Sequence, residues 1–163
     1  MRTSGVNAVD AGADFQRARR RHLLARVRRW LSVTCRRPSR PRDLGHVPAL
    51  VWRSAHLRSI PLDEIVGTVD PTADFDADFR PATERLSARW QSIARAHRDG
   101  RSLPPIVVIE RPDGYYILDG RHRVSVARAL GHDHIDACVR PVPRAGRHHA
   151  FRRTASLPRS VSA

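Results

Sequence analysis

Two short apolar runs separated by a short turn constrain the fold of this chain more than any other feature. The first run, Ile106–Ile109, consists of four consecutive β-branched residues, and the second is Tyr115–Leu118. An uninterrupted apolar run is typical of a strand that is buried on both faces. Between the runs, Arg111–Gly114 places Pro and Gly where a tight turn requires them. The sequence therefore predicts a β-hairpin.

A helix is predicted on each side of this hairpin. The earlier helix ends at Gly100, and the later one runs from Gly120 to Gly131. A strand over 134–139 follows, and Leu57–Gly67 indicates an earlier strand followed by a turn. The apolar stripe of the first helix is formed by Leu86, Trp90, Ile93, Ala94 and His97, and that of the second by Val124, Ala127 and Leu130. This order of elements predicts a compact α+β domain over residues 57–140.

The segments outside that domain are predicted from their loss of periodicity. Residues 1–12 are expected to be disordered, residues 13–56 to form a basic amphipathic helix and a linker, and residues 141–163 to form a basic disordered tail. The helix spans Phe15–Leu31 and carries Leu23, Leu24, Val27, Trp30 and Leu31 on one side. Its seven arginines are Arg17, Arg19, Arg20, Arg21, Arg26, Arg28 and Arg29.

The role of this helix stays open at the level of sequence. Three functional interpretations of the helix are open: it contacts DNA as an arm, it lies on an anionic membrane surface, or it docks to an acidic partner. The fourth is structural: the helix packs its Leu/Val/Trp face on the domain and leaves its arginines in solvent. We expect DNA to be contacted, if at all, without sequence preference.

The positive charge lies in the ends of the chain. The formal net charge is +14, and every basic residue except histidine is an arginine. Residues 1–60 hold 14 Arg and 3 acids, residues 61–140 hold 11 Arg and 13 acids, and residues 141–163 hold 5 Arg and no acid. Attraction to polyanions is therefore expected from the ends and not from the central domain.

The sequence gives no sign of a membrane span or a secretory signal. An organelle transit peptide is a minority alternative, because the first thirty residues are rich in arginine and poor in acids. Cys35 and Cys138 lack metal-type spacing, which suits a reducing compartment. We expect a cytoplasmic protein, nucleoid-associated if it binds DNA.

The stretch Asp119–Arg123 is the candidate site. A helix that starts near Gly120 leaves its first N–H groups free and places the positive end of its dipole there. Arg121, His122 and Arg123 add donors that suit phosphate oxygens. The alternative is an ordinary helix start, in which Asp119 caps the helix and the arginines pair with Glu110 or Asp136.

This motif and the order of elements resemble the ParB/sulfiredoxin-like domain over residues 58–140. The resemblance implies a small mixed sheet with packed helices. In ParB proteins the second conserved box, Gly-Glu-Arg-Arg, cradles the triphosphate of CTP; here Gly120 and Arg123 match, whereas Arg121 replaces the acid and His122 an arginine. The missing acid argues against CTP hydrolysis of the ParB type.

The other branches of this superfamily fit less well. Sulfiredoxins have their catalytic cysteine where Arg121 stands, which argues against sulfiredoxin chemistry. Nucleotide-dependent serine kinases of the same fold have an Asp-Gly-His-His-Arg-like site, which would make Asp119 a candidate catalytic residue and Mg²⁺ ligand.

The leading expectation is a stand-alone ParB-like module that binds a nucleoside triphosphate, CTP or ATP, through Gly120, Arg121, His122 and Arg123. The alternatives are a small-molecule kinase using Mg²⁺, a nuclease-like protein and a non-catalytic partner-binding protein, so whether the chain is an enzyme stays open. No resident metal is expected, because the aspartates of Asp70–Pro81 and the run His132–Asp136 lack a convincing ligand set.

Overall fold

A computed structural model describes residues 4–31, 40–45, 55–70 and 72–141 of the chain. They form a six-stranded sheet in the order β1-β3-β5-β4-β6-β2, with three α-helices. The strands are β1 (Arg42–Asp43), β2 (His56–Pro61), β3 (Ile65–Thr68), β4 (Ile106–Arg111), β5 (Gly114–Asp119) and β6 (His134–Pro141). The helices are α1 (Ser4–Leu31), α2 (Ser87–Arg98) and α3 (Arg121–Leu130), and a 3₁₀ turn, η2 (Glu84–Leu86), leads into α2.

The sheet is mixed, as the sequence led us to expect. Strands β4 and β5 form the predicted antiparallel hairpin at its centre, and β6 pairs parallel to β4. On the other side β3 pairs parallel to β5. The stretch 57–67, predicted as one strand and a turn, contains the end of β2 and the start of β3, because the chain turns at 62–64 and crosses to the far side of the sheet.

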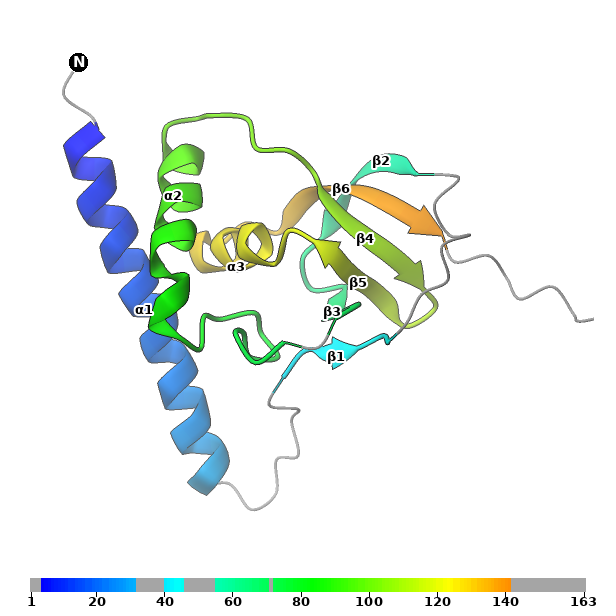
Figure 1. The fold of residues 1–163 in the computed structure, drawn as a ribbon, viewed down its shortest axis with the longest axis horizontal. Coiled ribbons are helices and arrows are strands. Elements are labelled where there is room, and N and C mark those ends of the chain that lie inside the picture. Colours follow the sequence, from blue (N-terminus) through cyan, green and yellow to red (C-terminus); the bar gives the residue numbers. More distant parts are fainter. Residues whose placement is uncertain (1–3, 32–39, 46–54, 71, 142–163) are drawn as a thin grey trace, which may run out of the picture.

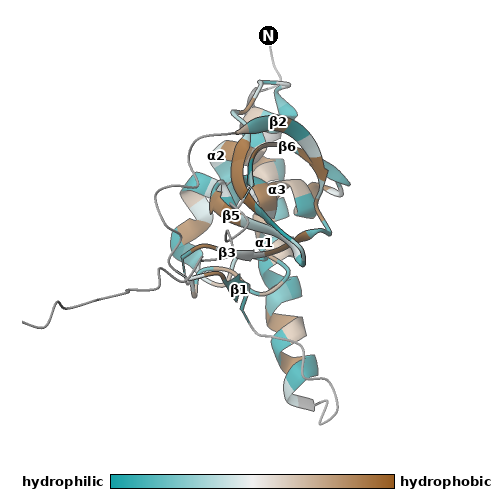
Figure 2. Ribbon diagram, turned by 90° about the vertical axis from the view of Figure 1, so that its right-hand side faces the viewer, coloured by the Kyte–Doolittle hydropathy of each residue, from teal (hydrophilic) through white to brown (hydrophobic). Residues whose placement is uncertain are grey.

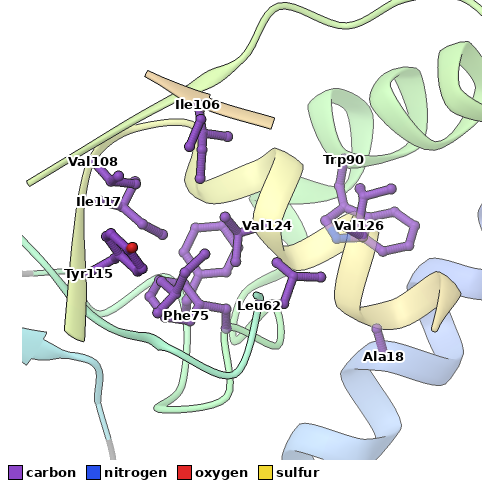
Figure 3. Packing of buried hydrophobic residues seen from close by; sticks show 14 of the residues in the cluster. Ala18, Leu62, Phe75, Trp90, Ile106, Val108, Tyr115, Ile117, Val124 and Val126 are labelled. Atoms are coloured by element: carbon purple, nitrogen blue, oxygen red, sulfur yellow. The ribbon is translucent and has the colours of Figure 1, made fainter. Parts of the chain in front are cut away.

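All three helices contribute to one hydrophobic core on one face of the sheet (Figure 1). Ile106, Val108 and Ile117 point from the central hairpin toward α3, where Val124 meets them (Figure 3). Trp90 of α2 is fully buried and donates a hydrogen bond from Nε1 to Ser125 Oγ of α3 at 2.9 Å. A smaller, separate hydrophobic cluster includes Ile109 and Tyr116. The core therefore fixes α3, and with it the β5–α3 junction.

Helix α1 begins at Ser4, so the prediction of disorder over residues 1–12 is wrong for residues 4–12. Ala11, Phe15 and Ala18 are buried, and the Phe15 ring packs edge-on against Trp90 with centroids 5.6 Å apart. The physical reason is tertiary: packing against α2 stabilises a helical segment that shows no periodicity of its own. The folded unit therefore includes α1, which the predicted boundary at residue 57 excluded.

The second half of α1, from Leu23 onward, contradicts the structural interpretation of this helix, in which its Leu/Val/Trp face packs on the domain. Leu23, Leu24, Val27 and Trp30 are 46%, 62%, 52% and 84% exposed, so the Leu/Val/Trp face does not pack on the domain. The side chains that do so belong to the other side of the helix. This half of α1 projects beyond the rest of the described chain in both views (Figures 1 and 2).

Two further predicted loops are more ordered than expected. Within the predicted linker, Arg42 and Asp43 pair as β1 with β3. In the acidic loop, Asp76 is only 2% exposed, and its carboxylate contacts two backbone N–H groups and His22 of α1. Pro141, the first residue of the predicted disordered tail, is instead the last residue of β6. The rest of that tail, residues 142–163, lies outside the described residues. No helix in the described chain has the length and apolar character that crossing a membrane requires.

Candidate functional site

The β5–α3 junction depends on Gly120. Its φ of 108° is in the left-handed region that side chains disfavour. A Cβ at this position would lie 2.5 Å from Ile106 Cγ2 and 2.8 Å from Ile106 Cβ, which is closer than carbon atoms pack. Glycine is therefore required both for the turn from strand to helix and for the close approach of β4.

The start of α3 is open at its backbone. Val124 N–H makes a bond to Gly120 O at 3.0 Å, and no side chain caps the first turn. The N–H groups of residues 121–123 precede that bond and point out of the helix end. The alternative interpretation, in which Asp119 caps the helix, is therefore wrong: its carboxylate is 64% exposed and bound to Arg123.

Arg123 is predicted to contact phosphate, and in the ligand-free chain its guanidinium is already bound by other parts of the protein. Its guanidinium donates to Asp119 Oδ2 at 2.6 Å, to Pro105 O at 2.8 Å and to Pro104 O. The side chain is 13% exposed. The predicted alternative partner Glu110 instead has its Oε1 3.5 Å from Nη1 of Arg58 on β2, across β6. In the ligand-free chain Arg123 therefore ties the α2–β4 connection to the start of α3.

His122 is half-buried against the 72–81 loop. Its ring packs edge-on against Phe75, with centroids 5.3 Å apart. Burial, followed by the positive charges of Arg89 and Arg121, lowers the pKa of His122 below its ordinary value, while Asp74 and Asp119 oppose the shift. Burial is therefore the main reason that the neutral form of the ring is favoured, and the two arginines add to it.

Two arginines near His122 are not engaged. Arg121 and Arg89 form no hydrogen bond or ion pair with the described part of the chain. The neighbouring Arg85, by contrast, is paired with Asp74. The site thus consists of the open helix start, His122 and two cations without a carboxylate partner. Arg89 was not found from the sequence, since only the packing of α2 on α3 brings it to the motif.

A separate cleft of about 310 Å³ lies beside the junction. It is lined by the α2–β4 connection, α3 and the start of β6, and Arg123 forms part of its wall. The Nε2 atoms of His97 and His132 face each other at 2.7 Å inside it. Gly120, Arg121 and His122 do not line this cleft, so the junction and the cleft meet only at Arg123.

The other candidate residues are distributed as follows. Two α1 arginines form ion pairs, Arg17 with Asp14 and Arg19 with Glu84. The remaining five, Arg20, Arg21, Arg26, Arg28 and Arg29, have no such partner in the described chain. In the same residues no three His, Cys, Asp or Glu side chains are placed to hold a metal ion.

Comparison with known proteins identifies a family and a similar fold among solved structures. The family model described as the ParB N-terminal domain matches residues 49–151, which is more than half of the chain. The crystal structure of sulfiredoxin from Arabidopsis thaliana matches with a TM-score of 0.41 and 22% sequence identity, covering 53% of this chain and 85% of that chain. No curated protein matches.

Proposed function

Because the chain belongs to the ParB N-terminal domain family, we propose that the start of α3 binds the phosphates of a nucleoside triphosphate. The observation that carries the proposal is that Arg89 and Arg121, whose charges both act on His122, form no hydrogen bond or ion pair within the described residues. An anion placed there would meet two guanidinium groups, the free N–H groups of residues 121–123 and the positive end of the helix dipole.

The environment of His122 supports an anion and not a cation as the ligand. Arg89 and Arg121 each lower its pKa, so both guanidinium charges are close enough to act on the ring. A phosphate group would reverse that effect and favour the protonated ring, which can donate a hydrogen bond to it. Binding would then take up a proton.

A binding role is favoured over phosphoryl transfer. Transfer needs carboxylates that hold Mg²⁺ or orient the acceptor. The two carboxylates near the junction are already in ion pairs, Asp119 with Arg123 and Asp74 with Arg85. We therefore assign nucleotide binding to the site, with Arg121, Arg89 and His122 as phosphate contacts and Gly120 as the turn that exposes the helix start.

Isothermal titration calorimetry with the nucleoside mono-, di- and triphosphates of cytidine and adenosine, with and without Mg²⁺, tests the proposal. Affinity should rise with phosphate number, and Arg121→Ala or Arg89→Ala should each weaken triphosphate binding by about 1–3 kcal/mol, the scale of a charge-assisted hydrogen bond. Both side chains lie outside the core, so the variants should fold.

The matched control is Arg111→Ala, which removes one positive charge at the opposite end of the β4–β5 hairpin. It should leave affinity unchanged, because exposed charges more than about 10 Å apart are largely screened at ordinary salt. Equal losses in all three variants would mean that only the net charge matters. Absence of binding by the wild type at millimolar triphosphate would refute the proposal.

A further inference from the structure

The outward face of α1 combines apolar and basic side chains that the domain does not use. Leu23, Leu24, Val27 and Trp30 form a stripe that is about half exposed or more along its length. At about 100° per residue, this stripe is turned roughly 140° about the helix axis from the buried face of Ala11, Phe15, Ala18 and His22. It therefore faces away from the domain, which leaves it accessible to a large flat partner.

Arginine borders this stripe on both sides. On the helical wheel Arg26 follows Trp30 on one flank, and Arg28 lies beyond Leu24 on the other. From residue 20 to residue 31 the helix carries five arginines and no acid, and none of the five has an ion-pair partner in the described chain. Apolar residues flanked by arginines, with a tryptophan among them, are typical of helices that lie in the membrane interface.

We propose that the stripe of Leu23, Leu24, Val27 and Trp30 docks on the surface of an anionic lipid bilayer. The arginines would contact the lipid phosphates, while the apolar side chains enter the boundary between headgroups and acyl chains. The stripe is short, about 10 Å along the axis. Apolar burial alone therefore gives weak binding, and attraction to anionic headgroups supplies the rest.

Two other occupants fit the surface less well. The phosphates of duplex DNA could pair with the arginines. The phosphate backbone, however, has no apolar surface against which the exposed Leu/Val/Trp stripe could pack. A second copy of the chain would bring two sets of five unpartnered arginines together, and a two-turn stripe is much smaller than the roughly 800 Å² per partner of a stable interface. The bilayer matches both the apolar and the charged component.

Flotation of the full chain with phospholipid vesicles tests this proposal. The chain should bind vesicles of phosphatidylcholine with about 30 mol % phosphatidylglycerol and should release them as salt rises. Pure phosphatidylcholine vesicles should bind it at least about tenfold more weakly. Binding should shift tryptophan emission to the blue. In a Trp52→Phe background, where Trp30 and the fully buried Trp90 are the remaining tryptophans, Trp30→Phe should keep binding but lose most of the shift.

The deciding variant is Leu23→Gln/Val27→Gln, which keeps every arginine and a good helix former at both exposed positions. Its partition onto anionic vesicles should fall at least about tenfold, the effect of withholding two aliphatic side chains from the interface. The matched control, Leu57→Gln, removes an apolar side chain that is 72% exposed on β2 and should bind like the wild type. Circular dichroism should show equal helix content in all variants.

Three results would overturn the proposal. The first is a double variant that binds anionic vesicles as well as the wild type. The second is a double variant that loses duplex DNA binding in a titration, which would assign the stripe to nucleic acid. The third is a wild type that fails to float but sediments as a dimer, with the double variant monomeric, which would assign the stripe to a second copy.

Discussion

Replacing Asp76 with alanine should destabilise the protein more than the same change at any other aspartate of its acidic loop. The Asp76 carboxylate is buried, and its Oδ1 accepts from the backbone N–H groups of Asp78 at 3.0 Å and Arg80 at 2.9 Å. Its Oδ2 lies 3.1 Å from Nδ1 of His22 on α1. This one side chain therefore holds the loop in shape and joins it to the N-terminal helix.

The magnitude follows from the groups that alanine would leave without a partner. Two backbone donors and the His22 ring would each lose a hydrogen bond in a place from which water is largely excluded. At about 1 kcal/mol or more for each group, the free energy of unfolding should fall by about 3–4 kcal/mol. Asp76→Asn retains one acceptor oxygen and should cost about 1–2 kcal/mol.

Urea unfolding monitored by tryptophan fluorescence measures these differences. Asp78→Ala is the matched control, because this aspartate is 39% exposed and its one ion pair within the described residues is with Arg80, at 2.7 Å. It should change the free energy of unfolding by less than about 1 kcal/mol. Equal effects of Asp76→Ala and Asp78→Ala would refute the reasoning, since burial and backbone hydrogen bonding would then make no difference.

Three other outcomes follow from the junction. Arg123→Ala should lower the midpoint of thermal unfolding, because the carbonyl groups of Pro104 and Pro105 lose their donor. An unchanged midpoint would mean that Arg123 does not stabilise the fold. Gly120→Ala should cost about 1–3 kcal/mol of unfolding free energy by urea titration, because the positive φ and Ile106 both oppose a Cβ. The pKa of His122 is lowered from 6.5, first by burial, so the unfolded state binds more protons and the stability should fall as pH drops below about 6.5. Thermal unfolding of His122→Gln should therefore depend less on pH than that of the wild type. An equal pH dependence of the two proteins would contradict this.

The centre of the fold could be predicted from the sequence because its signals are local. The β4–β5 hairpin follows from two apolar runs around a turn, and α3 follows from its apolar spacing and from Gly131, whose φ of 81° ends it. The family resemblance rests on the same central segment and is confirmed by the match to residues 49–151. These elements need no knowledge of distant partners.

The elements that were missed depend on contacts between distant parts of the chain. Residues 4–12 have no helical periodicity, and they are helical because α1 packs on α2 through Phe15 and Trp90. One of the four interpretations left open for α1 placed its outer stripe on the domain, and it is wrong because periodicity shows that a helix has an apolar side but not which side meets the domain. At the site, the motif located Gly120 and Arg121, while the approach of Arg89 and the engagement of Arg123 required the tertiary structure.

The order of strands also decides when the sheet can form as the chain is synthesised. Both edge strands, β1 and β2, belong to the first 61 residues, whereas the central hairpin begins at Ile106 and the partner of β2 is the last strand, β6. Until β6 has left the ribosome, β2 has no strand to pair with, and until α2 emerges, α1 has no helix to pack on.

Folding must therefore wait until the last strand emerges, and the N-terminal elements pass through synthesis with their apolar residues unprotected. A nascent chain in this state is a natural client for chaperones that hold unfolded segments. A nonsense mutation that removes β6 should leave an insoluble fragment and not a smaller folded domain, because one edge and the parallel partner of β4 disappear together.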